Sequence, residues 1–78
     1  MEIVHAFGKV IRQLRKEAKL TQEQLGFEAD LRRTFVSLLE LGQQQPTLTT
    51  IFKLAKALNV SASEIVRLIE NELNSEGA

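Results

Sequence analysis

The sequence predicts a single all-α domain built from five short helices. Three observations lead to this fold class. Apolar residues recur at spacings of three and four, helix start and stop signals separate five such segments, and no run alternates between apolar and polar residues as a strand would. A chain of 78 residues has room for one domain, which we place at residues 1–78.

The first helix is expected from about residue 2 to residue 19, and Gly8 weakens it slightly. Thr21 starts the second helix, because Thr followed three residues later by Gln24 is the pattern of a capping box. Asp30 tolerates the left-handed backbone conformation and is expected to end that helix. The apolar face of the first helix consists of Ile3, Val4, Phe7, Val10, Ile11, Leu14 and Ala18.

The third helix is expected to begin near Arg32 and to stop at Gly42. After a loop at residues 43–46, Thr47 is a plausible cap for a fourth helix that Asn59 can close. The apolar residues of the fourth helix are Leu48, Ile51, Phe52, Leu54, Ala55 and Leu58.

The fifth helix opens at a second capping-box pattern, formed by Ser61 and Glu64. We expect it to span about residues 62–73. The tail, residues 74–78, is expected to be frayed.

The charge of the chain is balanced overall but unevenly distributed. The chain has ten Lys and Arg residues and ten Asp and Glu residues, and this zero net charge counts against a nucleic-acid partner. Residues 9–19 hold five cations and one acid, whereas residues 64–78 hold four acids and one cation. Such a split favours separate functional surfaces, with two solvated helix faces as the alternative.

Several classes of function have little support in the sequence. The chain has no cysteine, and His5 is its only histidine, so neither a Cys–His nucleophile nor a typical zinc site can be assembled. No glycine-rich phosphate loop occurs. We therefore expect that the protein is not an enzyme and binds neither a metal nor a cofactor. No apolar run is long enough for a signal peptide or membrane span, and a cytoplasmic location is expected.

The most informative stretch is residues 22–41. Two helices joined steeply by a tight turn need a small side chain where they approach and a residue at ease with positive φ in the turn. Gly26 and Asp30 meet these two needs. The residues placed to pack this pair onto the first helix are apolar, namely Leu25, Ala29, Leu31, Val36 and Leu39.

Three segments carry a resemblance to a known family, namely IRQLRKEAKLTQEQL, LRRTFVSLLELG and PTLTTIFKLAKALNVSASEI. Over about residues 7–69 the sequence resembles the Cro/C1-type helix-turn-helix family, also called the XRE family, and is similar to phage repressors and restriction–modification controller proteins. The resemblance implies a five-helix, lambda-repressor-like domain with its helix-turn-helix at residues 22–41. It also implies a transcriptional regulator that binds a two-fold symmetric operator in double-stranded DNA as a homodimer, with the third helix in the major groove.

The resemblance assigns roles to individual residues. Gln22 is expected to hold a phosphate, and Arg32 is expected to meet phosphate rather than a base. Arg33 is the expected base reader, because a guanidinium can bind guanine O6 and N7 together. Arg15 and Glu40 match a structural pair that ties the first helix to the end of the third. The positions expected to contact DNA are Gln22, Arg32, Arg33, Thr34, Ser37, Leu38 and Gln43.

Two departures from the family pattern predict weaker and less salt-dependent binding. Leu38 stands where a polar or basic base reader is common, and it offers only apolar contact to a thymine methyl. Leu41 replaces a polar or basic residue that is common before the glycine, and Gln43 to Gln45 replace frequent lysines, so fewer counterions would be released. A protein-interaction module, such as an antitoxin or anti-regulator on the same fold, is the alternative function.

The fifth helix is the expected site of dimerisation. Ile65, Leu68 and Ile69 form a stripe suited to the core, while Val66 and Leu73 lie seven residues apart on its flank. We predict a two-fold interface made by Val66, Ile69 and Leu73, with ordinary core packing as the alternative. No small-molecule ligand is evident.

Overall fold

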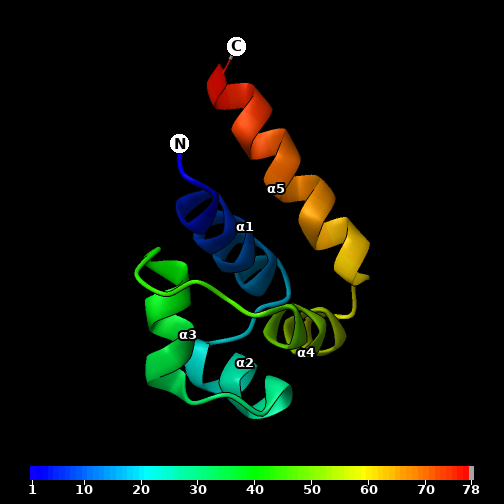
Figure 1. Ribbon diagram of the computed structural model, residues 1–78. Helices are drawn as coiled ribbons and strands as arrows, with labels where there is room; N and C mark the ends of the chain where they lie inside the picture. Colours follow the sequence, from blue (N-terminus) through cyan, green and yellow to red (C-terminus); the bar gives the residue numbers. More distant parts are fainter. Residues whose placement is uncertain (78) are drawn as a thin grey trace.

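The computed structural model describes residues 1–77, and the side chains of residues 1–75. Those residues contain no strand and form five α-helices (Figure 1). The all-α, five-helix prediction is therefore confirmed. The helices are α1 (Ile3–Glu17), α2 (Gln22–Ala29), α3 (Arg33–Glu40), α4 (Leu48–Leu58) and α5 (Ala62–Gly77).

The local capping signals act as the sequence indicated. The Thr21 hydroxyl accepts a hydrogen bond from the Gln24 N–H at 3.0 Å, and the Gln24 side chain accepts one from the Thr21 N–H at 2.8 Å. Asp30 ends α2 at φ 57°, and Asn59 ends α4 at φ 59°. Thr47 caps α4 by accepting from the Thr50 N–H at 3.1 Å. Each cap satisfies backbone groups that the helix itself leaves open.

The ends of two helices differ from the prediction. Helix α1 ends at Glu17, because Lys19 adopts a left-handed conformation at φ 62° and the Leu20 N–H donates back to the Arg15 carbonyl. Helix α5 continues to Gly77, so the expected frayed tail is wrong for residues 74–77, while Ala78 lies outside the described residues.

The capping box expected at the start of α5 is only half formed. The Ser61 hydroxyl accepts from the Glu64 N–H at 3.0 Å, as a cap should. The Glu64 carboxylate pairs with Arg67 at 2.7 Å. The interaction between these two side chains, one helical turn apart, takes the place of the second half of the box.

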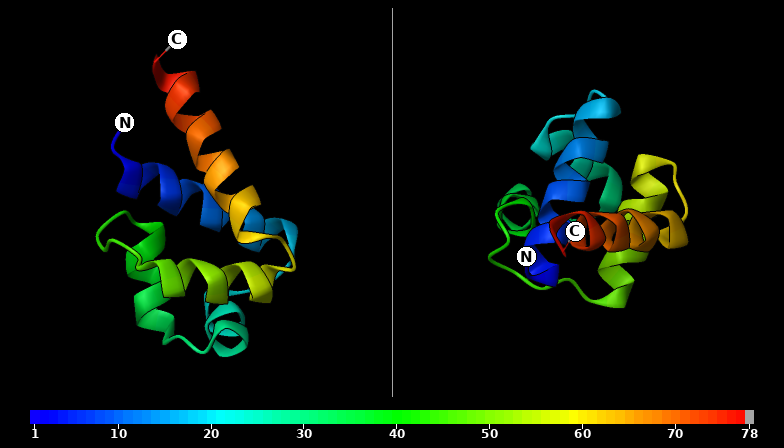
Figure 2. Two further views of the ribbon diagram at one scale, coloured as in Figure 1. Left: turned by 45° about the vertical axis from the view of Figure 1, so that its right-hand side comes forward. Right: turned by 90° about the horizontal axis from the view of Figure 1, so that it is seen from above.

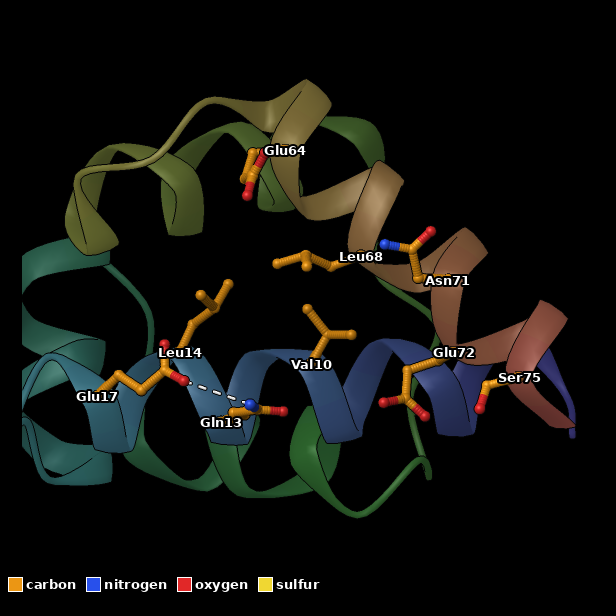
Figure 3. A pocket seen from close by; sticks show the side chains of 9 residues that line it. All are labelled: Val10, Gln13, Leu14, Glu17, Glu64, Leu68, Asn71, Glu72 and Ser75. Atoms are coloured by element: carbon orange, nitrogen blue, oxygen red, sulfur yellow. Dashed lines mark hydrogen bonds between the residues drawn. The ribbon is translucent and has the colours of Figure 1, made fainter.

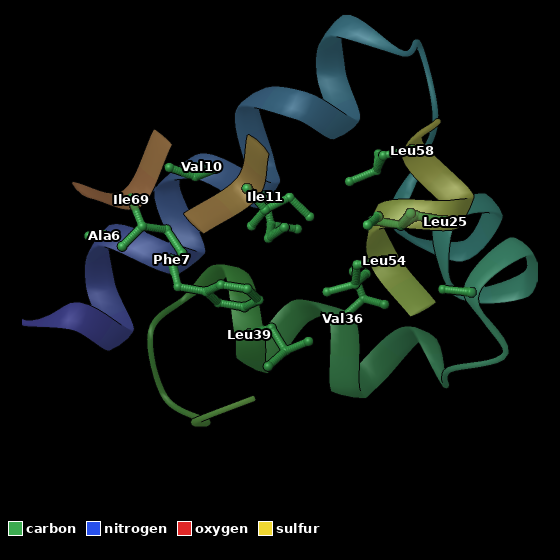
Figure 4. Close-up of a cluster of buried hydrophobic side chains, with 13 residues drawn as sticks. Ala6, Phe7, Val10, Ile11, Leu25, Val36, Leu39, Leu54, Leu58 and Ile69 are labelled. Atoms are coloured by element: carbon green, nitrogen blue, oxygen red, sulfur yellow. The ribbon is translucent and has the colours of Figure 1, made fainter. Parts of the chain in front are cut away.

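The helices pack around one core. Helix α1 packs against α3 and α5, α2 packs against α3 and α4, and α4 packs against α5. Figure 2, in the view from above, shows α5 crossing α1 at a steep angle, and Figure 1 shows α2 and α3 on the far side of α1 from α5. Figure 4 shows how the buried side chains of these helices meet. The largest of them are Phe7, Ile11, Leu25, Leu39, Leu54, Ile65 and Val36.

Among the described residues, none of the helices combines the length and the apolar character that crossing a lipid bilayer requires.

Candidate DNA-binding surface

Helix α2, a short turn and helix α3 form the surface that the sequence singled out. The turn closes tightly onto α2, because the Leu31 N–H donates to the Gly26 carbonyl at 2.8 Å. A Cβ atom added to Gly26 would lie 2.6 Å from the Leu31 carbonyl oxygen. The expectation of a small residue where the two helices approach is thus confirmed.

Helix α3 has one buried side and one open side. Val36 and Leu39 are fully buried and hold the helix against the core. On the opposite side Arg33 and Thr34 are exposed, Ser37 is half-buried, and Leu38 is exposed. The open side follows the spacing of a single helix face, so these four side chains can reach one ligand together. Leu41 is also exposed, just past the end of the helix.

Two further predicted positions flank α3. Arg32 is the residue before the helix and is exposed, and its side chain makes no capping hydrogen bond. Gln43 follows the helix closely, because the left-handed Gly42 turns the chain and the Gln43 N–H donates to the Leu38 carbonyl at 2.9 Å. The structure therefore brings Arg32 and Gln43 to opposite ends of α3.

A bidentate ion pair between Arg15 and Glu40 holds α3 against α1. Arg15 Nε lies 2.6 Å from Glu40 Oε2, and Arg15 Nη2 lies 3.0 Å from Glu40 Oε1. Arg15 Nη1 also donates to the Leu20 carbonyl at 2.9 Å. The Arg15 side chain is 12% exposed and that of Glu40 3%. The hydrogen bonds that Arg15 donates to the Glu40 carboxylate raise the pKa of Arg15, so the guanidinium stays charged. The predicted structural pair is present.

Gln22 also bonds to Glu40, which the sequence analysis missed. Gln22 Nε2 donates to Glu40 Oε1 at 3.1 Å, so a single carboxylate connects α1, α2 and α3. A primary amide has two N–H donors, and this bond leaves one of them for a phosphate. The two residues are 18 positions apart, and no sequence signal reports such a contact.

Lys9, one of the basic residues in the first helix, forms an ion pair with α5. Its ammonium lies 3.2 Å from a carboxylate oxygen of Glu72 on α5. It therefore links α1 to α5.

The residues expected at a dimer interface differ in accessibility. Val66 is 44% exposed, and Leu73 is partly buried against the core. Ile69 is only 8% exposed and belongs to the core, as its place in the predicted core stripe indicated, so it offers little area to an interface. The reason is its place between Ile65 and Leu73 on the side of α5 that packs inward.

Helix α4 carries two exposed apolar side chains, which the sequence analysis listed among its apolar residues without assigning them to a face. Leu48 is 68% exposed and Phe52 is 58% exposed. They lie four residues apart, whereas the buried residues of α4 are Thr50, Leu54, Ala55 and Leu58.

A braced pair of short helices with a tight turn, held in a five-helix domain, is the arrangement that defines the helix-turn-helix class. A family model described as helix-turn-helix matches residues 11–65, and the chain belongs to this family, in its XRE-type branch.

Known relatives include regulators of two kinds. The control protein C.BamHI of Bacillus amyloliquefaciens is 39% identical over 61 residues, covering 77% of this chain and 75% of that protein. The immunity repressor protein of Bacillus phage phi105 is 41% identical over 59 residues, covering 76% of this chain and 41% of that protein. The restriction–modification controller protein C.AhdI of Aeromonas hydrophila has a similar structure. Its TM-score is 0.78 at 39% identity, with 80% of this chain and 94% of that chain covered.

Proposed function

We propose that this protein is a sequence-specific DNA-binding transcriptional regulator, active in the cytoplasm, and that residues 1–78 form one DNA-binding domain. Helix α3 enters the major groove of a two-fold symmetric operator. The observation that carries this proposal is the open side of α3, which is held outward while its other side is buried. The relatives named as control and repressor proteins support a regulatory rather than a catalytic role.

The local charge of α3 suits DNA even though the net charge of the chain is zero. The only acid of α3 is Glu40, whose side chain is almost fully buried and neutralised by Arg15. Arg32 and Arg33 are both exposed at the start of the helix. The DNA backbone interacts mainly with the protein charges close to it. The acids on α5 therefore have little electrostatic effect at the α3 surface.

The roles of the contact residues follow from their places. Arg33 reads a guanine, while Thr34, Ser37 and Leu38 meet neighbouring base edges, Leu38 through a thymine methyl. Arg32, the free amide donor of Gln22 and the side chain of Gln43 hold phosphates on either side.

Replacing Arg33 by Ala is expected to remove the preference at one base pair in each half-site. Selection of bound sites from a random duplex library should return a palindrome for the wild-type protein. The variant should lose about 1–3 kcal/mol of discrimination at that pair and keep its non-specific affinity. Arg67→Ala, the same change at an exposed position on α5, is the matched control and should retain the full preference. A selection without any enriched sequence would favour the protein-interaction alternative.

We further propose that the regulator binds as a homodimer. A two-fold pair places two copies of α3 in successive major grooves, about 34 Å apart. Val66 and Leu73 on α5 form the core of this interface. The exposed Leu48 and Phe52 add apolar area from α4, the helix that packs on α5.

Val66→Asp is expected to weaken dimerisation and operator binding together, because it places a charge in an apolar contact. Sedimentation velocity and operator titration measure the two effects. Asn74→Asp introduces the same charge at an exposed polar position of α5 and should change neither. Full operator affinity from a monomeric, folded Val66→Asp variant would contradict the dimer proposal.

A further inference from the structure

Helices α1 to α4 all end in the same kind of turn. Just past each helix lies a residue with positive φ, and two backbone N–H groups of the turn donate back to carbonyls of the last helical turn. Such a turn is frequently completed by an apolar side chain at the next residue, which packs against the end of the helix. The residues with positive φ are Lys19, Asp30, Gly42 and Asn59.

The turn after α3 differs from the other three at this next residue. Leu20, Leu31 and Val60 complete the turns after α1, α2 and α4, and each is partly buried against the core. The equivalent residue after α3 is Gln43, which is polar and exposed. A side chain packed on the core could not also reach a phosphate, which is the role we propose for Gln43. The turn after α3 therefore needs support from another part of the chain.

The imidazole ring of His5 on α1 provides this support. A Cβ atom added to Gly42 would lie against Cδ2 of the ring and 3.1 Å from its Cγ and Nε2 atoms. The ring thus occupies the space that a side chain at residue 42 would need, and glycine combines this close approach with a φ of 73°. The His5 side chain is still 53% exposed, and its Nδ1 lies 3.6 Å from a carboxylate oxygen of Glu2.

Helix α1 meets α3 along a different stripe from the one that meets α5. Figure 3 shows Val10 and Leu14 of α1 pointing toward Leu68 of α5. The residues of the other stripe each contact the last turn of α3 or the residues that follow it. The close approach and the ion pair on this stripe hold the His5 ring in place over the turn. The members of the stripe are His5, Gly8 and Arg15.

We propose that His5 is a positioning residue for operator binding. Its ring holds the turn at Gly42 and thereby sets the direction in which the Gln43 side chain reaches a phosphate. His5 takes the part that an apolar residue 43 would otherwise play, which leaves residue 43 available to DNA. The role depends on the shape of the ring and not on its charge. This inference rests on the proposed DNA-binding function.

Amide hydrogen exchange in the free protein tests the contact between His5 and the turn. His5→Ala should speed the exchange of the Gln43 N–H, which donates to the Leu38 carbonyl, several-fold. The Val60 N–H makes the equivalent bond after α4 and should not change. His5→Phe keeps a flat ring without the imidazole nitrogens and should exchange at the wild-type rate. Unchanged exchange at Gln43 in the His5→Ala variant would overturn the proposal.

Operator titration of a double-mutant cycle tests whether His5 acts through Gln43. Gln43→Ala should weaken operator binding about fivefold, the effect of about one net hydrogen bond, and His5→Ala should cause most of this loss. The double variant should bind no more weakly than Gln43→Ala alone, since it has no side-chain amide left to position. Gln13→Ala, at an exposed position of α1 outside the stripe toward α3, is the matched control and should keep the wild-type affinity.

Three outcomes of this titration would refute the positioning role. Equal losses from His5→Ala with and without Gln43 would mean that His5 contacts DNA itself or acts through overall stability. A loss that His5→Phe does not restore would assign the effect to the imidazole nitrogens. A wild-type protein that binds no duplex would refute the proposed function and the positioning role with it, whereas the exchange data would still report whether His5 holds the turn.

Discussion

Replacing Arg15 by Met is expected to unfold a large share of the protein. The change leaves the Glu40 carboxylate, 3% exposed, with Gln22 as its one remaining side-chain partner. Removing one partner of a buried ion pair typically costs about 3–5 kcal/mol, because the other charge is left uncompensated. At about 0.05–0.15 kcal/mol per residue, the whole domain has a stability of only about 4–12 kcal/mol.

Urea unfolding followed by circular dichroism measures this loss, with Arg67→Met as the control. That variant makes the same substitution in an ion pair whose side chains are 57% and 39% exposed, where we expect a cost below about 1 kcal/mol. The double variant Arg15→Met with Glu40→Leu should recover part of the loss, because it removes the buried charge as well. Equal costs for Arg15→Met and Arg67→Met would show that Glu40 does not depend on its partner.

The sequence predicted most of the fold because the deciding signals are local. Thr21 with Gln24, Asp30 and Asn59 each set a helix end through atoms within a few residues, so their effect can be read from the chain. The end of α5 depends on tertiary contacts. Leu73 packs on the core and Glu72 pairs with Lys9, and these contacts support the helix beyond residue 73, where fraying of the terminus was expected.

Several features of the site could not be predicted for the same reason. Gly8 reads only as a weakness in the first helix. A Cβ atom at Gly8 would lie 2.6 Å from the carbonyl oxygens of Leu39 and Glu40, so this glycine lets α1 approach the end of α3. The Gln22–Glu40 bond likewise exists only once the turn has placed α2 beside α3.

The apolar spacing of the fifth helix was informative. The sequence placed Ile69 in a stripe suited to the core and Val66 on its flank, and the structure buries Ile69 and leaves Val66 44% exposed. The spacing could not say whether Ile69 also reaches an interface, because that depends on how far α1 and α4 cover it.

Gly26→Ala is expected to destabilise the protein and weaken operator binding, although Ala is the better helix former. The helix propensity of Ala would favour the variant by about 1 kcal/mol. Against this, the new Cβ atom would lie 2.6 Å from the Leu31 carbonyl oxygen and 3.4 Å from the Arg33 nitrogen. Both are backbone atoms, which cannot rotate away as the end of a side chain can, so we place the overpacking cost at the upper end of its range, about 3 kcal/mol.

The displaced atoms belong to the turn and to the first residue of α3, and this links stability to function. Relief of the contact moves the start of α3, where Arg33 projects, while Val36 and Leu39 hold the rest of the helix in the core. Urea unfolding and operator titration should therefore both change. Glu28→Ala, at an exposed position of the same helix, gains propensity without the contact and should be neutral or slightly stabilising. If Gly26→Ala matched Glu28→Ala in both measurements, the close approach of α2 to the turn would not be what positions α3.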